Sequence, residues 1–142
     1  MLESARVLRQ TGQRPLVNKG RALVVDEDRG DLAYYRAILQ RSGWMVVTCS
    51  SYSEAPDFFT AEPFDLVIVS QGSCAFEGRF VLERALMVDP KRPVLVVARS
   101  LDMGCYLEAM RMGAADYLEG PVPERELMRT TDAFLNSNSA AA

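Results

Sequence analysis

Short, continuous runs of aliphatic and β-branched residues recur along the chain and alternate with amphipathic stretches. Such a run places apolar side chains on both faces of a strand, which is typical of parallel strands covered by helices on both sides. With helix-length segments between them, five such runs predict a doubly wound parallel sheet of βα units. The predicted strands are Ala22–Val25, Met45–Cys49, Leu66–Ser70, Val94–Ala98 and Asp116–Leu118.

The segments between the strands carry apolar residues at helical spacing. In the first of them these residues are Leu32, Tyr35, Ile38 and Leu39. Each segment therefore presents one apolar stripe to the sheet. Helices on both sides of a sheet predict a three-layer α/β/α sandwich.

The start of the second helix has two competing predictions. A helix that begins at Ser53 places Pro56 in its first turn, where the missing N–H costs no hydrogen bond. Ser51 and Glu54 also have the spacing of a capping box, which predicts an earlier start. The sequence alone leaves both open.

One domain accounts for most of the chain. Its 142 residues, 49% hydrophobic and 25% charged, are ordinary for one globular domain. Residues 1–20 are polar and interrupted by proline and glycine, so we expect an N-terminal arm. Residues 21–135 form the predicted domain, and the small, polar residues 136–142 are expected to be a flexible tail or linker.

Charge and hydropathy exclude several classes of partner. The net charge is −3, and lysine and arginine are scattered rather than gathered into a stripe. We therefore expect no direct binding to nucleic acid or to an anionic membrane. No apolar run approaches the roughly 18 residues that span a bilayer, and the first residues lack the apolar centre of a secretory signal. These features predict a cytoplasmic protein.

Cysteine and histidine usage narrows the possible chemistry. Cys49, Cys74 and Cys105 are odd in number and widely spaced, which fits neither a disulfide framework nor a zinc site, so we expect reduced thiols. Histidine is absent. This excludes Ser–His and Cys–His nucleophilic catalysis and imidazole metal ligands. Any catalysis would have to use carboxylates or lysine.

The carboxyl ends of the strands are where a ligand is expected, because crevices form there in doubly wound sheets. The first strand ends in an acidic cluster suited to a cation, whereas the third ends without a charge. The residues at these ends are Asp26, Glu27 and Asp28 after the first strand, Ser70 at the third, Ala98 and Arg99 at the fourth, and Glu119, Gly120 and Pro121 after the fifth.

Several segments, in order, resemble the receiver domain of two-component response regulators. They are ALVVDED at 22–28, FDLVIVS at 64–70, FEG at 76–78, PVLVVA at 93–98 and MGAADYLEGPV at 112–122. The last is the most specific, and the resemblance covers about residues 21–135. It implies a flavodoxin-like (βα)5 fold with strand order 2-1-3-4-5 and a role in phosphorelay signal transduction.

The chain departs from the family at three positions. In the family, the third strand ends in the aspartate that accepts phosphate, the fourth in Thr or Ser, and the fifth strand is followed by Lys before Pro. Here these positions hold Ser70, Ala98 and Gly120. The missing groups are the nucleophile, a hydrogen-bond donor to the phosphoryl oxygen and the ammonium that neutralises it. Of the usual set, Asp26 and Glu27 remain.

The losses are mutually consistent. Like charges about 4 Å apart repel by about 4 kcal/mol at an effective dielectric of 20. A pocket without the third carboxylate no longer needs the lysine. The resemblance therefore implies a degenerate receiver that is not an enzyme, is not phosphorylated on aspartate, needs no cofactor, and acts by binding other signalling proteins or an output domain.

Two alternatives stay open. Ser70 is the acceptor in the first, with Mg²⁺ held by Asp26 and Glu27, a backbone carbonyl near Gly72 and water. This alternative is weakened because a serine hydroxyl needs a base and the chain has no histidine. In the second, the crevice binds another small ligand, which no residue identifies.

The resemblance carries four further expectations. Tyr117 matches the family's switch aromatic, although without a hydroxyl at Ala98 we expect it to be a ring packed at the sheet edge. The peptide bond before Pro121 is expected to be cis. Arg99 or Arg79 is expected to occupy the pocket in place of the lysine. The surface formed by about residues 103–135 is the expected partner or homodimer face.

Overall fold

A computed structural model describes residues 18–141, with side chains described to Asn136. Five parallel strands form one sheet in the order β2-β1-β3-β4-β5, as expected. This is the flavodoxin-like arrangement. The strands are β1 (Gly20–Val25), β2 (Trp44–Cys49), β3 (Leu66–Ser70), β4 (Val94–Ala98) and β5 (Asp116–Glu119).

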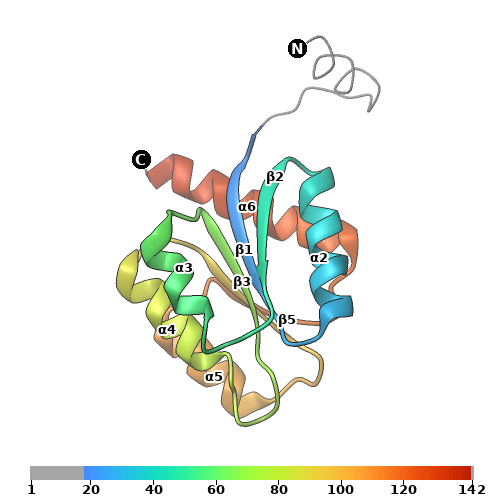
Figure 1. Cartoon of the computed structure of the whole chain (residues 1–142), viewed down its shortest axis with the longest axis vertical. Helices are drawn as coiled ribbons and strands as arrows, with labels where there is room; N and C mark the ends of the chain where they lie inside the picture. Colours follow the sequence, from blue (N-terminus) through green and yellow to red (C-terminus); the bar gives the residue numbers. More distant parts are fainter. Residues whose placement is uncertain (1–17, 142) are drawn as a thin grey trace.

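Helices cover both faces of the sheet and produce the expected three layers (Figure 1). Two of them, α2 and α6, pack on one face, and the other three pack on the opposite face. The helices are α2 (Arg29–Arg41), α3 (Ala55–Ala61), α4 (Arg79–Val88), α5 (Met103–Met112) and α6 (Glu124–Ala141).

The continuous apolar runs are explained by burial on both faces. Along β1, Leu23 and Val25 belong to the core beneath α3, α4 and α5, whereas Ala22 and Val24 belong to the core beneath α2. All four side chains are at most 1% exposed. Because successive side chains point to opposite faces of a strand, a strand buried on both sides has no polar position.

Register brings the ends of the central strands together. Val25 at the end of β1 pairs with Val69, and Ser70 at the end of β3 pairs with Val97 on β4. The residues that follow these strands therefore meet at one edge of the sheet. This carboxyl edge is where the sequence placed the candidate site.

Three element boundaries inside the domain differ from the sequence-based expectations, and the first is that β2 begins at Trp44 rather than Met45. Helix α3 begins at Ala55 rather than Ser53, with Pro56 in its first turn as expected. The Ser51 hydroxyl accepts a hydrogen bond from the Glu54 N–H, at 3.2 Å, and this bond stabilises a turn before the helix rather than its first turn. Strand β5 extends one residue further, to Glu119.

The two ends of the domain also lie outside the expected limits. Strand β1 begins at Gly20, and Lys19 forms an ion pair with Asp132 on α6, at 2.9 Å. The expected N-terminal arm comprised residues 1–20, and residues 1–17 of it lie outside the described residues. Helix α6 continues to Ala141, beyond the expected boundary at Asn136. A helix that has already formed extends at little cost per residue.

Among residues 18–141, no helix combines the length and the apolar composition that crossing a bilayer requires.

Helix α4 offers a matched test of the core. Leu82 is fully buried, whereas Met87 on the same helix is 70% exposed. We expect Leu82→Ala to lower the free energy of unfolding by about 2–5 kcal/mol, because it leaves a cavity. Met87→Ala should change it by no more than about 0.5 kcal/mol. Urea denaturation followed by circular dichroism measures both, and equal effects would contradict this packing.

Candidate functional site

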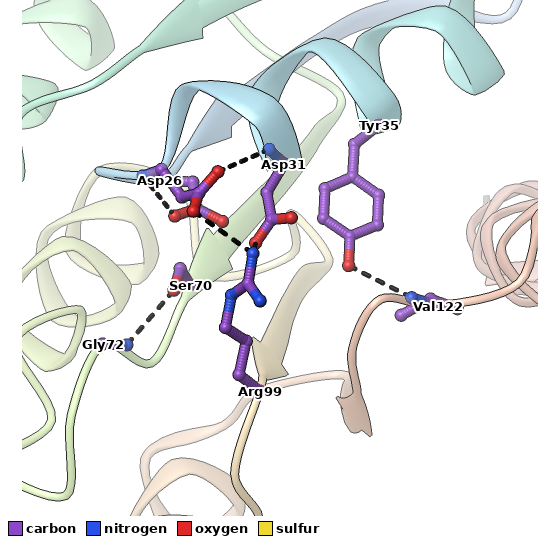
Figure 2. Close-up of polar contacts among 8 residues, drawn as sticks. Asp26, Asp31, Tyr35, Ser70, Gly72, Arg99 and Val122 are labelled. Carbon is purple, nitrogen blue, oxygen red and sulfur yellow. Dashed lines mark hydrogen bonds and ion pairs between the residues drawn. The ribbon is translucent and has the colours of Figure 1, made fainter.

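The acidic pair at the end of β1 divides into a buried and an exposed carboxyl group. Asp26 is 7% exposed, and Glu27 is exposed. The Asp26 Oδ1 atom accepts a hydrogen bond from the Asp28 N–H, at 2.9 Å. Asp28 in turn caps α2, because its Oδ1 atom accepts from the Asp31 N–H, at 2.9 Å. The start of α2 therefore positions the buried acid (Figure 2).

Burial raises the pKa of the Asp26 carboxyl from 3.8 to about 6. Burial is the largest cause of this shift. The Asp28 N–H and the positive charge of Arg99 oppose it, the negative charges of Asp31 and Asp28 favour it, and the value of about 6 includes all of these effects. Desolvation disfavours the ionised form of an acid. The pocket therefore compensates the Asp26 charge incompletely.

Ser70 is half-buried, and its hydroxyl is engaged locally. Its Oγ atom accepts a hydrogen bond from the Gly72 N–H, at 3.2 Å (Figure 2). Tyr52 lies beside it: burial raises the pKa of the Tyr52 phenol to about 12, and a hydrogen bond with Ser70 opposes that rise. Among the hydrogen bonds of the described residues, none joins Ser70 to a carboxylate. The serine thus lacks a base that would activate it.

The two arginines expected near the pocket have different partners. Arg99 forms ion pairs with Asp31 at 2.8 Å and with Asp28 at 3.2 Å, and its side chain is 60% exposed (Figure 2). It lies at the rim and does not pair directly with Asp26. Arg79 instead pairs with Glu108 on α5, at 2.9 Å. We expected one arginine to occupy the pocket in place of the family's lysine. Arg99 reaches only the rim of the pocket.

Gly120, at the family's lysine position, has no room for a side chain. A Cβ atom there would lie 2.6 Å from Val97 Cγ1 and 2.9 Å from the Tyr35 hydroxyl oxygen. Both distances are shorter than ordinary van der Waals contact. Val97 is β-branched and Tyr35 is 1% exposed, so neither side chain can move aside freely. Tyr35 and Val97 together close the space into which a residue at position 120 would extend.

Two adjacent tyrosines of α2 hold the turn that follows Gly120. The Val122 N–H donates to the Tyr35 hydroxyl at 3.1 Å, and the Tyr34 hydroxyl donates to the Val122 carbonyl at 2.7 Å. Burial raises the pKa of Tyr35 to about 12. The Gly120–Pro121 peptide bond within this turn is cis, as expected.

Tyr117 is buried, with 8% exposure, and is hydrogen-bonded to Gln71, a residue that was not predicted from the sequence. Its hydroxyl donates to the side-chain oxygen of Gln71 and accepts from the Asp102 N–H, at 3.2 Å. Gln71 is 1% exposed, and its amide nitrogen donates to the carbonyls of Ser73 and Ser100. Gln71 thereby joins the loops after β3 and β4 to β5. The one sequence signal was a polar residue directly after an apolar run.

The expected partner face carries exposed apolar side chains. A cavity of about 300 Å³ lies at the start of α5, lined by Leu101, Asp102, Met103, Tyr106 and Tyr117. Leu101 is 57% exposed and Met103 69%, and Leu107 nearby is 58% exposed. The face is thus more apolar than the charges of residues 103–135 suggested.

The residues present fit a magnesium ion poorly. Mg²⁺ requires near-octahedral oxygen ligation and is usually held by one or two carboxylates together with further ligands. Here Ser70 replaces a charged ligand, and the Asp26 carboxyl is already bonded to a backbone N–H. Within the part of the chain that the structure describes, no three acidic, cysteine or histidine side chains converge on one point.

Comparison with known proteins agrees with the fold. Residues 22–132 match the family model described as the response regulator receiver domain. The chain belongs to this family. The resemblance of the sequence to receiver domains is therefore confirmed.

Curated relatives of this receiver domain are transcriptional regulators. The chain is 29% identical over 125 residues to the alginate biosynthesis transcriptional regulatory protein AlgB of Pseudomonas syringae pv. tomato, covering 88% of this chain and 28% of AlgB. It is 28% identical over 113 residues to the transcriptional regulatory protein ZraR of Escherichia coli, covering 80% of this chain and 26% of ZraR. The chain thus spans about a quarter of their length.

A solved structure shares the same fold. The CheY-like receiver domain protein from Methanospirillum hungatei superposes with a TM-score of 0.80 at 24% identity, covering 86% of this chain and 98% of that one. At this identity the likeness concerns the fold alone.

The raised pKa of Asp26 predicts a pH-dependent stability. An acid whose pKa is about 6 in the folded protein and about 3.9 in the unfolded chain lowers the free energy of unfolding as pH rises from about 4 to about 6. We expect Asp26→Asn to stabilise the protein by about 1–3 kcal/mol at pH 7 and to have little effect near pH 4. Denaturant titrations across this range measure the difference. Glu27→Gln, the exposed control, should stay within about 0.5 kcal/mol, and a matching gain there would contradict the assignment to Asp26.

The contact between Gly120 and Tyr35 is testable with a double-mutant cycle. Gly120→Ala should destabilise by about 1–3 kcal/mol through overlap with Val97 and Tyr35. Tyr35→Phe should cost about 1–3 kcal/mol, because the buried Val122 N–H loses its acceptor. In the double variant the alanine meets one obstacle fewer, so we expect the total to fall short of the sum by at least about 0.5 kcal/mol. Additive losses in denaturant titrations would show that the two residues are not coupled.

Proposed function

We propose that this receiver domain transmits signals by binding other proteins and is not switched by phosphorylation of an aspartate. The observation that carries the proposal is the joint replacement of three chemical groups at the carboxyl edge by Ser70, Ala98 and Gly120. In this proposal the domain is not an enzyme and requires no magnesium.

The surroundings of Ser70 support the first part of the proposal. Its hydroxyl is bonded to the Gly72 N–H and lies beside Tyr52. A hydroxyl without a general base is a weak nucleophile. Phosphoryl transfer to Ser70 would also develop negative charge, and Arg99 at the rim of the pocket is paired with Asp28 and Asp31. No cation is left to stabilise the transferred group at Ser70 from that side.

The packing around Gly120 supports it further. A lysine at this position would need a Cβ atom, and that atom would overlap with Val97 and Tyr35. The loss of the ammonium group is thus accompanied by a packing arrangement that excludes it. A single reverse substitution would therefore not restore the usual chemical set.

The apolar face near α5 supports the protein-binding part. Leu101, Met103 and Leu107 are each more than half exposed. Clustered exposed apolar side chains mark interaction sites more often than ordinary surface. The partner in this proposal is a signalling protein or an output domain, and a homodimer through residues 103–135 is one form of it. Among the curated relatives, both AlgB and ZraR are about four times longer than the matched segment, which is consistent with a receiver that works through a further domain.

Phosphorylation is tested directly by mass spectrometry. The protein is incubated with acetyl phosphate and Mg²⁺, and its intact mass is measured against Ser70→Ala treated in the same way. We expect neither protein to gain a phosphoryl group, because the nucleophile, hydroxyl and ammonium are all missing. A gain in the wild type that Ser70→Ala abolishes would overturn the proposal in favour of a serine acceptor. A gain that persists in Ser70→Ala would also overturn it and would locate the acceptor elsewhere.

A further inference from the structure

Two of the three cysteines approach each other beside the carboxyl edge. Cys74 lies in the loop between β3 and α4 and is exposed, whereas Cys105 lies in the first turn of α5 and is 4% exposed. The Cys105 thiol donates to the Cys74 backbone carbonyl, with 3.5 Å between Sγ and O. A carbonyl oxygen lies about 2.4 Å from its own Cα atom. The Cys105 sulfur is therefore within about 6 Å of the Cys74 Cα atom, so the two cysteines are neighbours, and a bond of about 2 Å between their sulfurs requires a further approach.

A second contact joins the same two segments. Arg79 at the start of α4 pairs with Glu108 on α5, at 2.9 Å. The Gln71 side chain also bonds to the Ser73 carbonyl in the loop and accepts from Tyr117 beside α5. The loop that carries Cys74 is thus held beside α5 while both thiols are reduced, and forming a bridge requires a rotation of the exposed Cys74 side chain together with a small shift of the loop.

We propose that Cys74 and Cys105 form a reversible intramolecular disulfide when the protein meets a low-molecular-weight disulfide such as glutathione disulfide. The bridge ties the β3–α4 loop to α5. This inference is independent of the proposed function, because it rests on the two thiols alone.

The reaction proceeds by two thiol–disulfide exchanges. In the first, the Cys74 thiolate attacks one sulfur of glutathione disulfide, so that a bond forms between Cys74 and one glutathione and the other glutathione leaves as a thiolate. In the second, Cys105 loses its proton and attacks the Cys74 sulfur, and the second glutathione leaves. Two protein thiols are oxidised, and one reagent disulfide is reduced to two thiols, which take up the two protons released.

The exposure and the surroundings of the two thiols indicate which of them reacts first. Cys74 is open to the reagent, whereas burial raises the pKa of the Cys105 thiol to about 11. Neighbouring groups add to this: Asp102 at the N-cap of α5, and Cys74 and Glu77 in the loop. Tyr117 on β5 also faces Cys105. A rarely ionised thiol reacts slowly with a dissolved reagent but is suited to attack a mixed disulfide held beside it.

Cys49 provides an internal comparison. It lies at the end of β2, and its thiol donates to the Ser51 carbonyl at 3.2 Å. Burial raises its pKa as well. Among the hydrogen bonds of the described residues, none joins Cys49 to Cys74 or Cys105.

The full chain is incubated with glutathione disulfide near about pH 8, its remaining thiols are alkylated, and the protein is digested without reduction. We expect an intact mass lower by two hydrogen atoms, alkylation of Cys49 alone, and a linked peptide pair that contains Cys74 and Cys105. Reduction with dithiothreitol should restore the original mass. A stable glutathione adduct on Cys74 with Cys105 still alkylated, a pair that includes Cys49, or a bond between two molecules would overturn the proposal.

Variants separate the two steps. Cys49→Ser should form the bridge at the wild-type rate, Cys105→Ser should stop at the glutathione adduct, and Cys74→Ser should form no bridge. The bridge is mapped in the wild-type protein, so the test of the proposal does not depend on whether every variant folds. From about pH 7 to pH 9, closure of the mixed disulfide should accelerate by up to about tenfold per pH unit as Cys105 ionises. A closure rate independent of pH would exclude Cys105 as the second thiol.

Discussion

Burial of the sheet on both faces is the constraint on which the rest of the structure depends. Strands β1, β3 and β4 have helices on either side, so no polar chemistry is possible along their length. Partly exposed positions occur only at and beyond the ends of these strands. Ser70 ends β3, Ala98 ends β4, and Gly120 follows β5. Ser70 and Gly120 are half-buried and lie where chemistry can change with little effect on the core, whereas Ala98 is fully buried in the core beneath α3, α4 and α5.

The substitutions at this edge are coupled through packing as well as through charge. The Tyr35 hydroxyl lies where a side chain at position 120 would begin, and it accepts the Val122 N–H that follows. The same residue thus excludes a lysine and satisfies a buried donor. The charged residues at this edge also affect one another. Burial raises the pKa of Asp26, and the positive charge of Arg99, which pairs with Asp28 and Asp31, opposes this rise only in part. The acidic end of β1 is thereby held by hydrogen bonds from α2, without a cation bound directly to it.

The sequence predicts the sheet well because burial on both faces leaves an unmistakable run of apolar residues, and it predicts the composition of the carboxyl edge because strand ends follow from those runs. The start of α3 was less predictable, since it depends on whether the Ser51–Glu54 hydrogen bond belongs to the helix or to a turn before it. Tyr35 was placed correctly in the apolar stripe of the first helix, but its hydroxyl contact with a turn 87 positions away is invisible in a periodic pattern. Gln71 was missed because a single polar residue after a strand ordinarily faces solvent, and its burial depends on two loops and strand β5, which meet only in the fold.

Tyr35 and Gln71 together explain why the edge can hold one conformation without a charge at its centre. Tyr35 fixes the turn after β5, and Gln71 fixes Tyr117 and the loops after β3 and β4. These bonds join uncharged side chains and backbone groups, so they do not depend on the ionisation of a residue at position 70. Buried hydrogen bonds of this kind are costly to break, because their partners cannot turn to water. The position of Tyr117 next to the exposed Leu101 and Met103 is therefore set by the protein's own hydrogen bonds. A surface held in this way is available to a partner at all times, which is the behaviour that the proposed function requires.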